Sequence, residues 1–350
     1  MPKTVAVIDG NSFIQRAYHA VPPTMTAPDG TPTNAAFGFL SMLLKFIEME
    51  QPDALVCAFD KGRPKFRMEA LEQYKAQRPP MDEELKAQFP VIENLLASMN
   101  VPVVALPGWE GDDILGTVAA RDEELGYRTL LVTGDKDAYQ LASDLTKIVT
   151  TKRGITDVVI YGPEEVEERY GVTPAQFTDF LGLKGDKADN IPGVPGVGEK
   201  TAAKLLAEWG SLDDVLEHAD EIKGKKGDAL RESIEQIRLN RKVNALVRDL
   251  DLGVDIADLT FGKVDPAKAE ELFYQLNFGA RIRSKLLKTF NAGDPGQPVA
   301  KKASDAERFE FEGEFDDGSF DTPESVRVQE PVVDEIDAPA SLEAWAQQHC

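Results

Sequence analysis

The first 135 residues contain four short apolar runs, rich in β-branched residues, that alternate with longer segments of helical periodicity. The runs have the length of buried strands: Thr4–Ile8, Ala54–Phe59, Val101–Leu106 and Thr129–Val132. Between them, Asn34–Glu50 and Gly111–Leu125 are the clearest candidates for helices. Strands that alternate with helices form parallel sheets, because a crossover helix returns the chain to the same edge. The pattern predicts an α/β fold with a mainly parallel central sheet flanked by helices.

Strand signals fade after Tyr161, where the pair Gly162-Pro163 ends one pattern and opens a helix. We therefore predict an α/β core over residues 1–161 and a helical region over residues 162–290. Residues 291–337 are acidic and punctuated by Gly and Pro, which predicts a disordered linker. Residues 338–350 regain an amphipathic pattern, and we interpret them as the start of a further domain.

The acidic tail also carries phenylalanines at positions 309, 311, 315 and 320. A solvated spacer is the simpler interpretation of such a segment. A segment that docks on a partner through these phenylalanines is the alternative.

The formal net charge is −22, from 39 Lys and Arg against 61 Asp and Glu, whereas most general nucleic-acid binders are basic. However, residues 291–350 hold 15 acids and 4 bases, so half of the negative charge lies in the tail. Two cysteines exclude a disulfide framework, and three histidines leave too few ligands for structural zinc. With no secretion signal and no apolar stretch of membrane-spanning length, we expect a cytoplasmic protein without a membrane partner.

Acidic residues follow each of the four predicted strands, and two more follow a predicted helix of the second region. They are Asp9, Asp60, Glu110, Asp112, Asp113, Asp135 and Asp137, and then Asp186 and Asp189. Ligands bind at the carboxyl ends of parallel strands, so we expect these acids to converge. Converging carboxylates need cations, and all-oxygen ligands favour two or more Mg²⁺ ions, with Mn²⁺ as a substitute. Any one of these acids alone is equally well explained as the N-cap of the next helix.

Basic residues are concentrated between Lys61 and Pro80, with six bases against two acids. On a continuous helix, Arg67, Lys75 and Arg78 would share one face. Together with Tyr74, that face would suit a single nucleic-acid strand, with the aromatic ring as a stacking platform. An ordinary solvated helix face is the alternative.

The segment GVPGVGEKTA, at positions 193–202, has the pattern of a helix-hairpin-helix within residues 191–207. Its glycines permit a tight turn whose backbone N–H groups can bind a phosphate at the start of the following helix. The expected contacts to duplex DNA are Gly193, Gly196, Val197, Gly198, Lys200 and Thr201. A second basic window, residues 223–242, has seven bases against three acids and would extend this surface.

Several of these segments, read in order, carry a specific resemblance. They are VIDGNSFIQRAYHA, AFDKGRPKFR, YKAQRPP, GWEGDDILGT, VTGDKDAYQL and GDKADNIPGVPGVGEKTA. Together, over residues 1–290, they resemble the 5′-nuclease domains of bacterial DNA polymerase I, within the wider flap endonuclease family. The resemblance implies a PIN-like or flap-nuclease-like fold. It also implies a 5′→3′ exonuclease and structure-specific 5′-flap endonuclease that acts on DNA in Okazaki-fragment maturation and excision repair.

The resemblance also implies roles for individual residues. The family's metal ligands fall on the nine acids named above, and its basic contacts to the reacting phosphate and the threaded strand fall on Arg16, Arg67, Lys75 and Arg78. A helical arch would lie at about residues 61–90. Flapped, nicked or branched duplex DNA would be the substrate, and polymerase domains would follow in the same chain of a monomeric protein.

Two other functions fit part of the pattern. A haloacid-dehalogenase-like phosphatase would use Asp9 as nucleophile, but it needs an acid two residues later, where this chain has Asn11. A catalytically silent DNA-binding module would be expected to lack some of the acids, and none is missing. Because Ser12 has no evident histidine base, an activated water is the expected nucleophile.

Overall fold

The computed structural model describes residues 2–151 and 158–291, all of which belong to one compact unit. The predicted linker at 291–337 lies, apart from its first residue, outside the described residues, as does the predicted start of a domain at 338–350. No helix of the described residues is long and apolar enough to cross a membrane.

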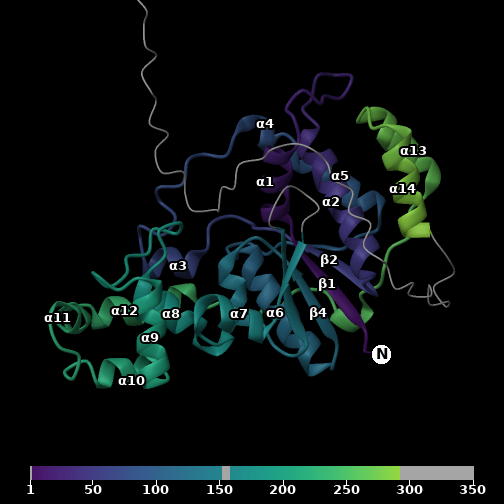
Figure 1. The fold of residues 1–350 in the computed structure, drawn as a ribbon. Coiled ribbons are helices and arrows are strands. Elements are labelled where there is room, and N and C mark those ends of the chain that lie inside the picture. Colours follow the sequence, from purple (N-terminus) through teal and green to yellow (C-terminus); the bar gives the residue numbers. More distant parts are fainter. Residues whose placement is uncertain (1, 152–157, 292–350) are drawn as a thin grey trace, which may run out of the picture. The chain divides into compact units, whose positions relative to one another are not determined.

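A six-stranded sheet forms the centre of the α/β region, with the strand order β3-β2-β1-β4-β5-β6 (Figure 1). The strands are β1 (Thr4–Asp9), β2 (Ala54–Ala58), β3 (Val103–Val104), β4 (Arg128–Val132), β5 (Thr146–Thr151) and β6 (Val158–Tyr161). All neighbouring pairs are parallel except β5 and β6. The predicted mainly parallel sheet is therefore confirmed.

Helices flank the sheet and make up most of the chain after β6. The α-helices are α1 (Gly10–Ala20), α2 (Asn34–Glu50), α3 (Lys65–Ala70), α4 (Glu83–Lys86), α5 (Phe89–Ser98), α6 (Gly111–Glu124), α7 (Pro163–Tyr170), α8 (Phe177–Lys184), α9 (Glu199–Trp209), α10 (Leu212–Glu217), α11 (Lys225–Glu232), α12 (Ile234–Asn244), α13 (Pro266–Gln275) and α14 (Ala280–Asn291). Three short 3-10 helices are η1 (Lys136–Leu141), η2 (Pro174–Gln176) and η3 (Ile256–Asp258).

Two features of the sheet differ from the prediction. The third strand is only two residues long, because the other residues of the predicted strand Val101–Leu106 do not form ladder pairs with β2. The last two strands, β5 and β6, are an antiparallel pair that the sequence pattern did not predict. Thr146–Thr151 reads TKIVTT, and its polar residues hide the strand signal from a search for apolar runs.

Alternate residues of the central strand enter two different cores, as expected for a strand buried on both faces. Val5 and Val7 lie in the core that includes α6 and α8. Ala6 and Ile8 lie in the core that includes α1, α2, α5, α13 and α14. The sheet is thus the middle layer between helices, and its carboxyl edge is left for a site.

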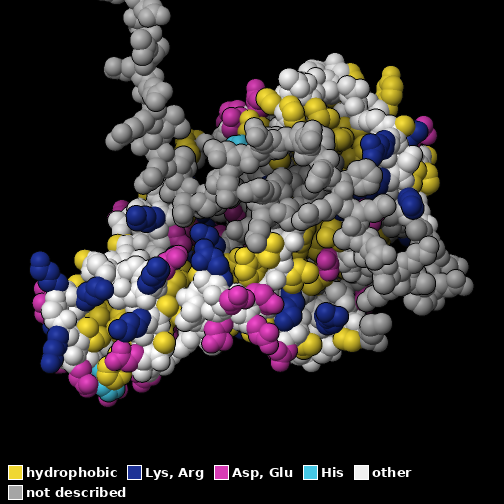
Figure 2. Space-filling model, in the orientation of Figure 1, with side chains coloured by type: hydrophobic (Ala, Val, Ile, Leu, Met, Phe, Trp, Pro, Cys, Tyr) yellow, Lys and Arg dark blue, Asp and Glu magenta, His cyan; other side chains and the backbone are white. Residues whose placement is uncertain are grey.

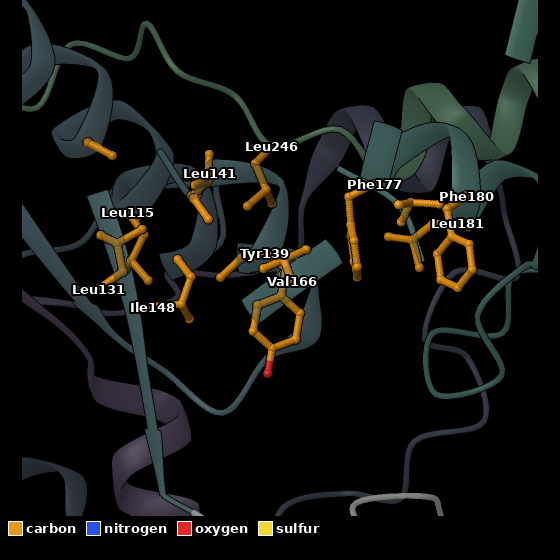
Figure 3. Close-up of a cluster of buried hydrophobic side chains, with 14 of the residues drawn as sticks. Leu115, Leu131, Tyr139, Leu141, Ile148, Val166, Phe177, Phe180, Leu181 and Leu246 are labelled. Atoms are coloured by element: carbon orange, nitrogen blue, oxygen red, sulfur yellow. The ribbon is translucent and has the colours of Figure 1, made fainter. Parts of the chain in front are cut away.

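The first core continues without a break into the helical region. Figure 3 shows Leu131 and Ile148 of the sheet in the same cluster as Phe177 and Phe180 of α8. Leu206 of α9 is fully buried in this cluster as well. The change at 161/162 is therefore a change of secondary structure within one continuous core.

One buried acid, Asp122 on α6, lies outside the carboxyl edge of the sheet. Its Oδ2 accepts a hydrogen bond from Thr129 Oγ1 at 2.8 Å, whereas its Oδ1 has no partner among the described residues. Burial raises the pKa of Asp122 to about 7, although Thr129 and Lys3 act in the opposite direction. The protonated form is therefore favoured in the folded state.

We expect Asp122 to make stability depend on pH. Its pKa is higher in the folded than in the unfolded chain, so its contribution is fully present below about pH 4 and is lost as the pH rises through 7. The loss amounts to up to about 4 kcal/mol, at 1.36 kcal/mol per pKa unit. Urea unfolding from pH 4 to 8 should show a smaller loss for Asp122→Asn than for the wild type, and parallel curves would contradict the assignment.

Candidate active site

The register of the parallel strands brings the predicted acids to one edge. Asp9 is paired with Ala58 of β2, and Ile8 is paired with Val132 of β4. Thr133 therefore follows directly beside Asp9, and its Oγ1 donates to Asp9 Oδ2 at 2.6 Å. Thr133 is not among the residues predicted from the sequence, although its position directly after a predicted strand is a signal that could have identified it.

Two of the acids also serve as N-caps, so the simpler interpretation of each acid alone holds in part. Asp9 Oδ1 accepts the N–H of Ser12 at 3.0 Å at the start of α1. Asp135 Oδ1 accepts the N–H of Asp137 at 2.9 Å at the start of η1. Capping engages one carboxylate oxygen and orients the other.

Small polar residues hold the loops around this edge. Asn11 Oδ1 accepts the N–H of Asp60 at 3.0 Å, and Asp60 Oδ1 accepts the N–H of Gly111 at 2.6 Å. The hydroxyl of Ser12 accepts the N–H of Gly134 at 3.0 Å. Ser12 therefore helps to hold the loop that follows β4.

Arg67 is the most deeply buried cation of the site, with 2% of its surface exposed. Its guanidinium binds both oxygens of Asp113, at 2.7 and 2.8 Å, and Glu110 Oε2 at 2.9 Å. It also donates to the carbonyls of Val243, at 2.9 Å, and Ala245, at 3.2 Å. The carboxylate of Asp113, with no exposed surface, is already satisfied by this pairing.

The prediction that Arg67, Lys75 and Arg78 share one helix face is wrong. The helix that contains Arg67, α3, ends at Ala70, and the chain then turns. Lys75 has a φ of 53°, which does not continue a helix. The predicted helical arch at 61–90 accordingly contains only α3, α4 and the first residues of α5, with turns and irregular chain between them.

The structure also corrects the assignment of Arg67 and Tyr74 as DNA contacts. Arg67 is enclosed by protein, as described above. Tyr74 has 6% of its surface exposed, so its ring is not an open stacking platform. Its hydroxyl lies 3.0 Å from Glu110 Oε2 and 3.1 Å from Asp189 Oδ2. Both side chains are buried and contact the carboxylates of the acidic edge.

Lys75 and Arg78 do reach the acidic edge. Lys75 Nζ lies 2.6 Å from Glu110 Oε1 and 3.5 Å from Asp189 Oδ2, and Arg78 Nη2 lies 2.5 Å from Asp189 Oδ1. Burial alone would lower the pKa of Lys75, but Asp189, Tyr74 and Glu110 raise it well above its ordinary value. The ammonium group therefore stays charged beside the carboxylates. Arg78 is half exposed and faces solvent on its other side.

The nine acids divide into two sets by their partners. Glu110, Asp113 and Asp189 form ion pairs with Arg67, Lys75 or Arg78. The remaining six make no ion pair with a Lys or Arg of the described residues: Asp9, Asp60, Asp112, Asp135, Asp137 and Asp186. The second set is the part of the site that still lacks counter-charge.

The pKa values of three unpaired acids, Asp9, Asp112 and Asp137, are raised, mainly by burial. Burial raises the pKa of Asp9 to about 7, against the effect of its hydrogen bonds to Ser12 and Thr133. Loss of water contact, followed by the charge of Asp135, holds the pKa of both Asp112 and Asp137 well above the usual range. Asp112 Oδ1 is buried and has no hydrogen-bond partner among the described residues.

The donor chemistry fits a hard divalent cation, although the arrangement is not a finished metal site. Within residues 2–151 and 158–291, no three Asp, Glu, His or Cys side chains are arranged to hold a metal ion. The orphaned oxygen of Asp112 and the mutual repulsion of the acids are what a bound cation would relieve. The set of nine metal ligands stays a prediction.

Arg16 lies on α1, two helical turns beyond Asp9, and is partly buried. Burial lowers the pKa of its guanidinium. A catalytic role for Arg16 stays a prediction.

The predicted helix-hairpin-helix is formed by α8, the turn at 185–198 and α9. Gly193 lies where the two arms meet, and a Cβ there would clash with the carbonyl of Lys184. Gly196 has a φ of 79°, and there is open space where its side chain would be. Glycine is therefore required at one position by packing and at the other by the turn.

The tip of this hairpin is open to solvent. Val197 is buried beneath the tip, whereas Gly198 and Lys200 are exposed. Thr201 Oγ1 accepts a hydrogen bond from Lys226 at 3.2 Å, which links the hairpin to α11. Figure 2 shows Lys and Arg side chains gathered over the region of α9, α11 and α12. The hairpin and the second basic window thus form one cationic surface.

Comparison with known proteins bears directly on this arrangement. Residues 4–171 match the family model described as "5′-3′ exonuclease, N-terminal resolvase-like domain", and residues 172–267 match "5′-3′ exonuclease, C-terminal SAM fold". The chain belongs to the 5′-3′ exonuclease family. Its family boundary falls at 171/172, ten residues after the predicted change at 161/162.

Curated relatives of this exonuclease chain include DNA polymerases I. That of Bacillus caldotenax is 43% identical over 87% of this chain, and that of Mycobacterium bovis is 39% identical over 83%. These matches cover 34% and 32% of the relatives, so the chain spans about a third of their length.

Solved structures share the fold of this exonuclease chain. A flap endonuclease of bacteriophage T5, in a complex with DNA and metal ions, has a TM-score of 0.57 at 20% identity. That match covers 83% of this chain and all of the T5 chain. The catalytic core of Rad2 with a DNA substrate has a TM-score of 0.54 at 15% identity, covering 82% of this chain and 91% of its own.

Neighbouring acids on α6 should respond to amidation in opposite ways. Asp113→Asn places an amide against the guanidinium of Arg67 and should lower the free energy of unfolding by about 3 kcal/mol, because it breaks a buried ion pair. Asp112→Asn removes a repelled carboxylate and should maintain or raise stability in EDTA. Urea unfolding at pH 7 measures both, and equal losses would mean that the two acids have equivalent surroundings.

Proposed function

We propose that this chain is a metal-dependent 5′→3′ exonuclease and structure-specific 5′-flap endonuclease that hydrolyses DNA phosphodiester bonds to 5′-phosphate products. The observation that carries the proposal is the division of the acids at the carboxyl edge. Six lack counter-charge, and two others, Glu110 and Asp189, are joined to Lys75 and Arg78, which can also meet phosphate. Membership of the 5′-3′ exonuclease family supports the reaction class.

The cation that best suits the unpaired acids is Mg²⁺, with Mn²⁺ as a substitute, because all the donors are carboxylate oxygens. The residues proposed to hold two or more ions are the six unpaired acids: Asp9, Asp60, Asp112, Asp135, Asp137 and Asp186. Bound Mg²⁺ supplies Lewis-acid chemistry that activates water and stabilises charge on the leaving 3′-oxygen. The other three predicted ligands, Glu110, Asp113 and Asp189, are proposed to complete the set of nine and also to position cationic side chains.

The scissile phosphate is proposed to be held by Lys75 and Arg78, with Arg16 as an additional contact. Without DNA, Lys75 and Arg78 form ion pairs with Glu110 and Asp189. Their N–H donors can instead bind a phosphate oxygen when a substrate is present. Lys75 has a backbone conformation that Lys rarely adopts, and its N–H donates to the carbonyl of Asp189 at 2.9 Å. Such strain is often found where a side chain is pre-positioned for chemistry.

Duplex DNA is proposed to bind the cationic surface of α9, α11 and α12. Exposed N–H groups in the first turn of a helix bind phosphate without reading bases, which suits Gly198, Lys200 and Thr201. Structural neighbours are described in complexes with DNA, which supports the same partner here. The cationic surface explains how a chain of net charge −22 can bind DNA.

The biological setting follows from the relatives. Since the relatives named DNA polymerase I are about three times as long as the matched region, we propose that polymerase domains follow in the natural protein. Primer removal from Okazaki fragments and DNA repair, both in the cytoplasm, are the proposed processes. We propose that the chain acts as a monomer.

A flap assay tests the function. The substrate is a 5′-flap duplex labelled at either end, incubated with Mg²⁺ or with EDTA, and products are sized on a denaturing gel. We expect cuts near the flap junction only with the metal, and a loss of at least 100-fold in rate for Asp112→Asn. Glu124→Gln, an exposed acid on the same helix, is the control and should cut at the wild-type rate. Binding without cleavage under any metal would favour the catalytically silent DNA-binding module.

The role of Lys75 is tested by separating binding from chemistry. Lys75→Ala should lower the single-turnover rate by 10- to 1,000-fold, while the Kd for the flap duplex changes by less than threefold, because the donor acts on developing charge. Lys75→Arg should restore part of the rate. Equal losses in rate and affinity would instead assign Lys75 a purely electrostatic part in binding.

A further inference from the structure

An apolar groove of about 500 Å³ lies on the opposite helical layer from α6, between the first half of α2 and the start of α14. It is lined by Phe37, Ser41, Gly279, Arg281, Ile282 and Lys285. The ring of Phe37 packs edge-on against Phe278, with ring centroids 5.4 Å apart. The nine acids described above do not line this groove.

The rim of the groove is cationic. Helix α14 carries four bases, Arg281, Arg283, Lys285 and Lys288, and no acid. Arg281 is exposed and makes no ion pair with another described residue, whereas Lys285 lies 3.3 Å from Glu48. In Figure 2, hydrophobic and basic side chains lie side by side over the region of α13 and α14. A partner for this surface should combine apolar side chains with negative charge.

This chain contains a segment of that chemistry. Residues 304–321, SDAERFEFEGEFDDGSFD, have eight acids and one base, hence a net charge of 1 − 8 = −7. Phe309, Phe311, Phe315 and Phe320 are interleaved with the acids. A groove of this volume can accept one or two aromatic rings, and acids flanking the rings would meet the basic rim. Neither the nuclease chemistry nor the DNA surface uses these phenylalanines.

The segment can reach the groove within the same molecule. Helix α14 ends at Asn291, and 12 residues separate it from position 304. Twelve residues span up to about 40 Å when extended, and the 12-residue helix is about 18 Å long. The chain can therefore return to the start of α14. Such a tether gives an effective concentration on the order of 1 mM, which favours binding within one molecule over binding between copies.

We propose that residues 304–321 of this chain dock by their phenylalanines into the groove between α2 and α14, with the acids against Arg281 and Lys285. The docked segment holds the acidic chain on the opposite helical layer from α6 and away from the cationic DNA surface of α9, α11 and α12. The proposal does not depend on the nuclease assignment.

Photo-crosslinking in the full chain tests the docking. Phe311 is replaced by p-benzoylphenylalanine, the protein is irradiated at low micromolar concentration, and crosslinked peptides are identified by mass spectrometry. We expect crosslinks within the monomer to peptides that contain residues 37–41 or 279–285, at least fivefold above those from the same probe at Glu330. Crosslinks to another part of the chain, yields no higher than at position 330, or crosslinks only between two copies would each overturn the proposal.

Charge reversal on α14 supplies the matched comparison. The double variant Arg281→Glu with Lys285→Glu should reduce the crosslink yield at least fivefold, because it reverses the charge contacts. Addition of 0.5 M NaCl to the unreversed chain should also reduce the yield, by a smaller factor, because salt screens these contacts. Arg283→Glu makes the same kind of change on the same helix at a residue paired with Glu270, and should leave the yield within twofold of the unreversed chain. Equal reductions in all the variants, with unchanged circular dichroism, would contradict docking at this groove.

Discussion

Repulsion among carboxylates at the carboxyl edge of the sheet is the constraint to which much of this structure responds. Parallel strands place Asp9 and the acids that follow β2, β3 and β4 at one edge, and each acid is partly removed from water. Three acids are neutralised from within by Arg67, Lys75 and Arg78. The chain between β2 and α4 brings these cations to the edge, with α3 ending after six residues and Lys75 in a conformation with positive φ.

The same cation network joins the two regions of the fold. Arg67 binds Asp113 at the start of α6 and also binds the carbonyls of Val243 and Ala245 at the end of α12. Asn240, one turn earlier on α12, donates to the carbonyls of Gly182 on α8 and Pro192 in the hairpin turn. A chain of buried polar contacts therefore runs from the acidic edge to the hairpin. Since buried polar groups are costly when unpaired, this chain holds the two surfaces in a defined relation.

Much of the fold and the composition of the site were predictable from residue patterns, because those patterns are local. Apolar runs and helical periodicity located β1, β2, β4 and α2 to within one or two residues, and Gly193 and Gly196 marked a turn that the structure contains. The antiparallel pair β5 and β6 escaped because β5 contains several polar residues and β6 has only four residues. Arg67 and Tyr74 were misassigned because a basic or aromatic residue looks the same in sequence whether it faces solvent or a buried carboxylate.

By itself, the sequence determined the α/β class, the position of acids at strand ends and membership of the 5′-3′ exonuclease family, since each depends on residue type and spacing along the chain. Only the tertiary structure decided which acids are neutralised by protein cations and which lack counter-charge. That division depends on contacts between residues at least 35 positions apart, such as Lys75 with Glu110 and Arg78 with Asp189. Such contacts form because the turns after α3 and α8 fold back on the sheet. No local sequence pattern encodes which of these distant residues meet there.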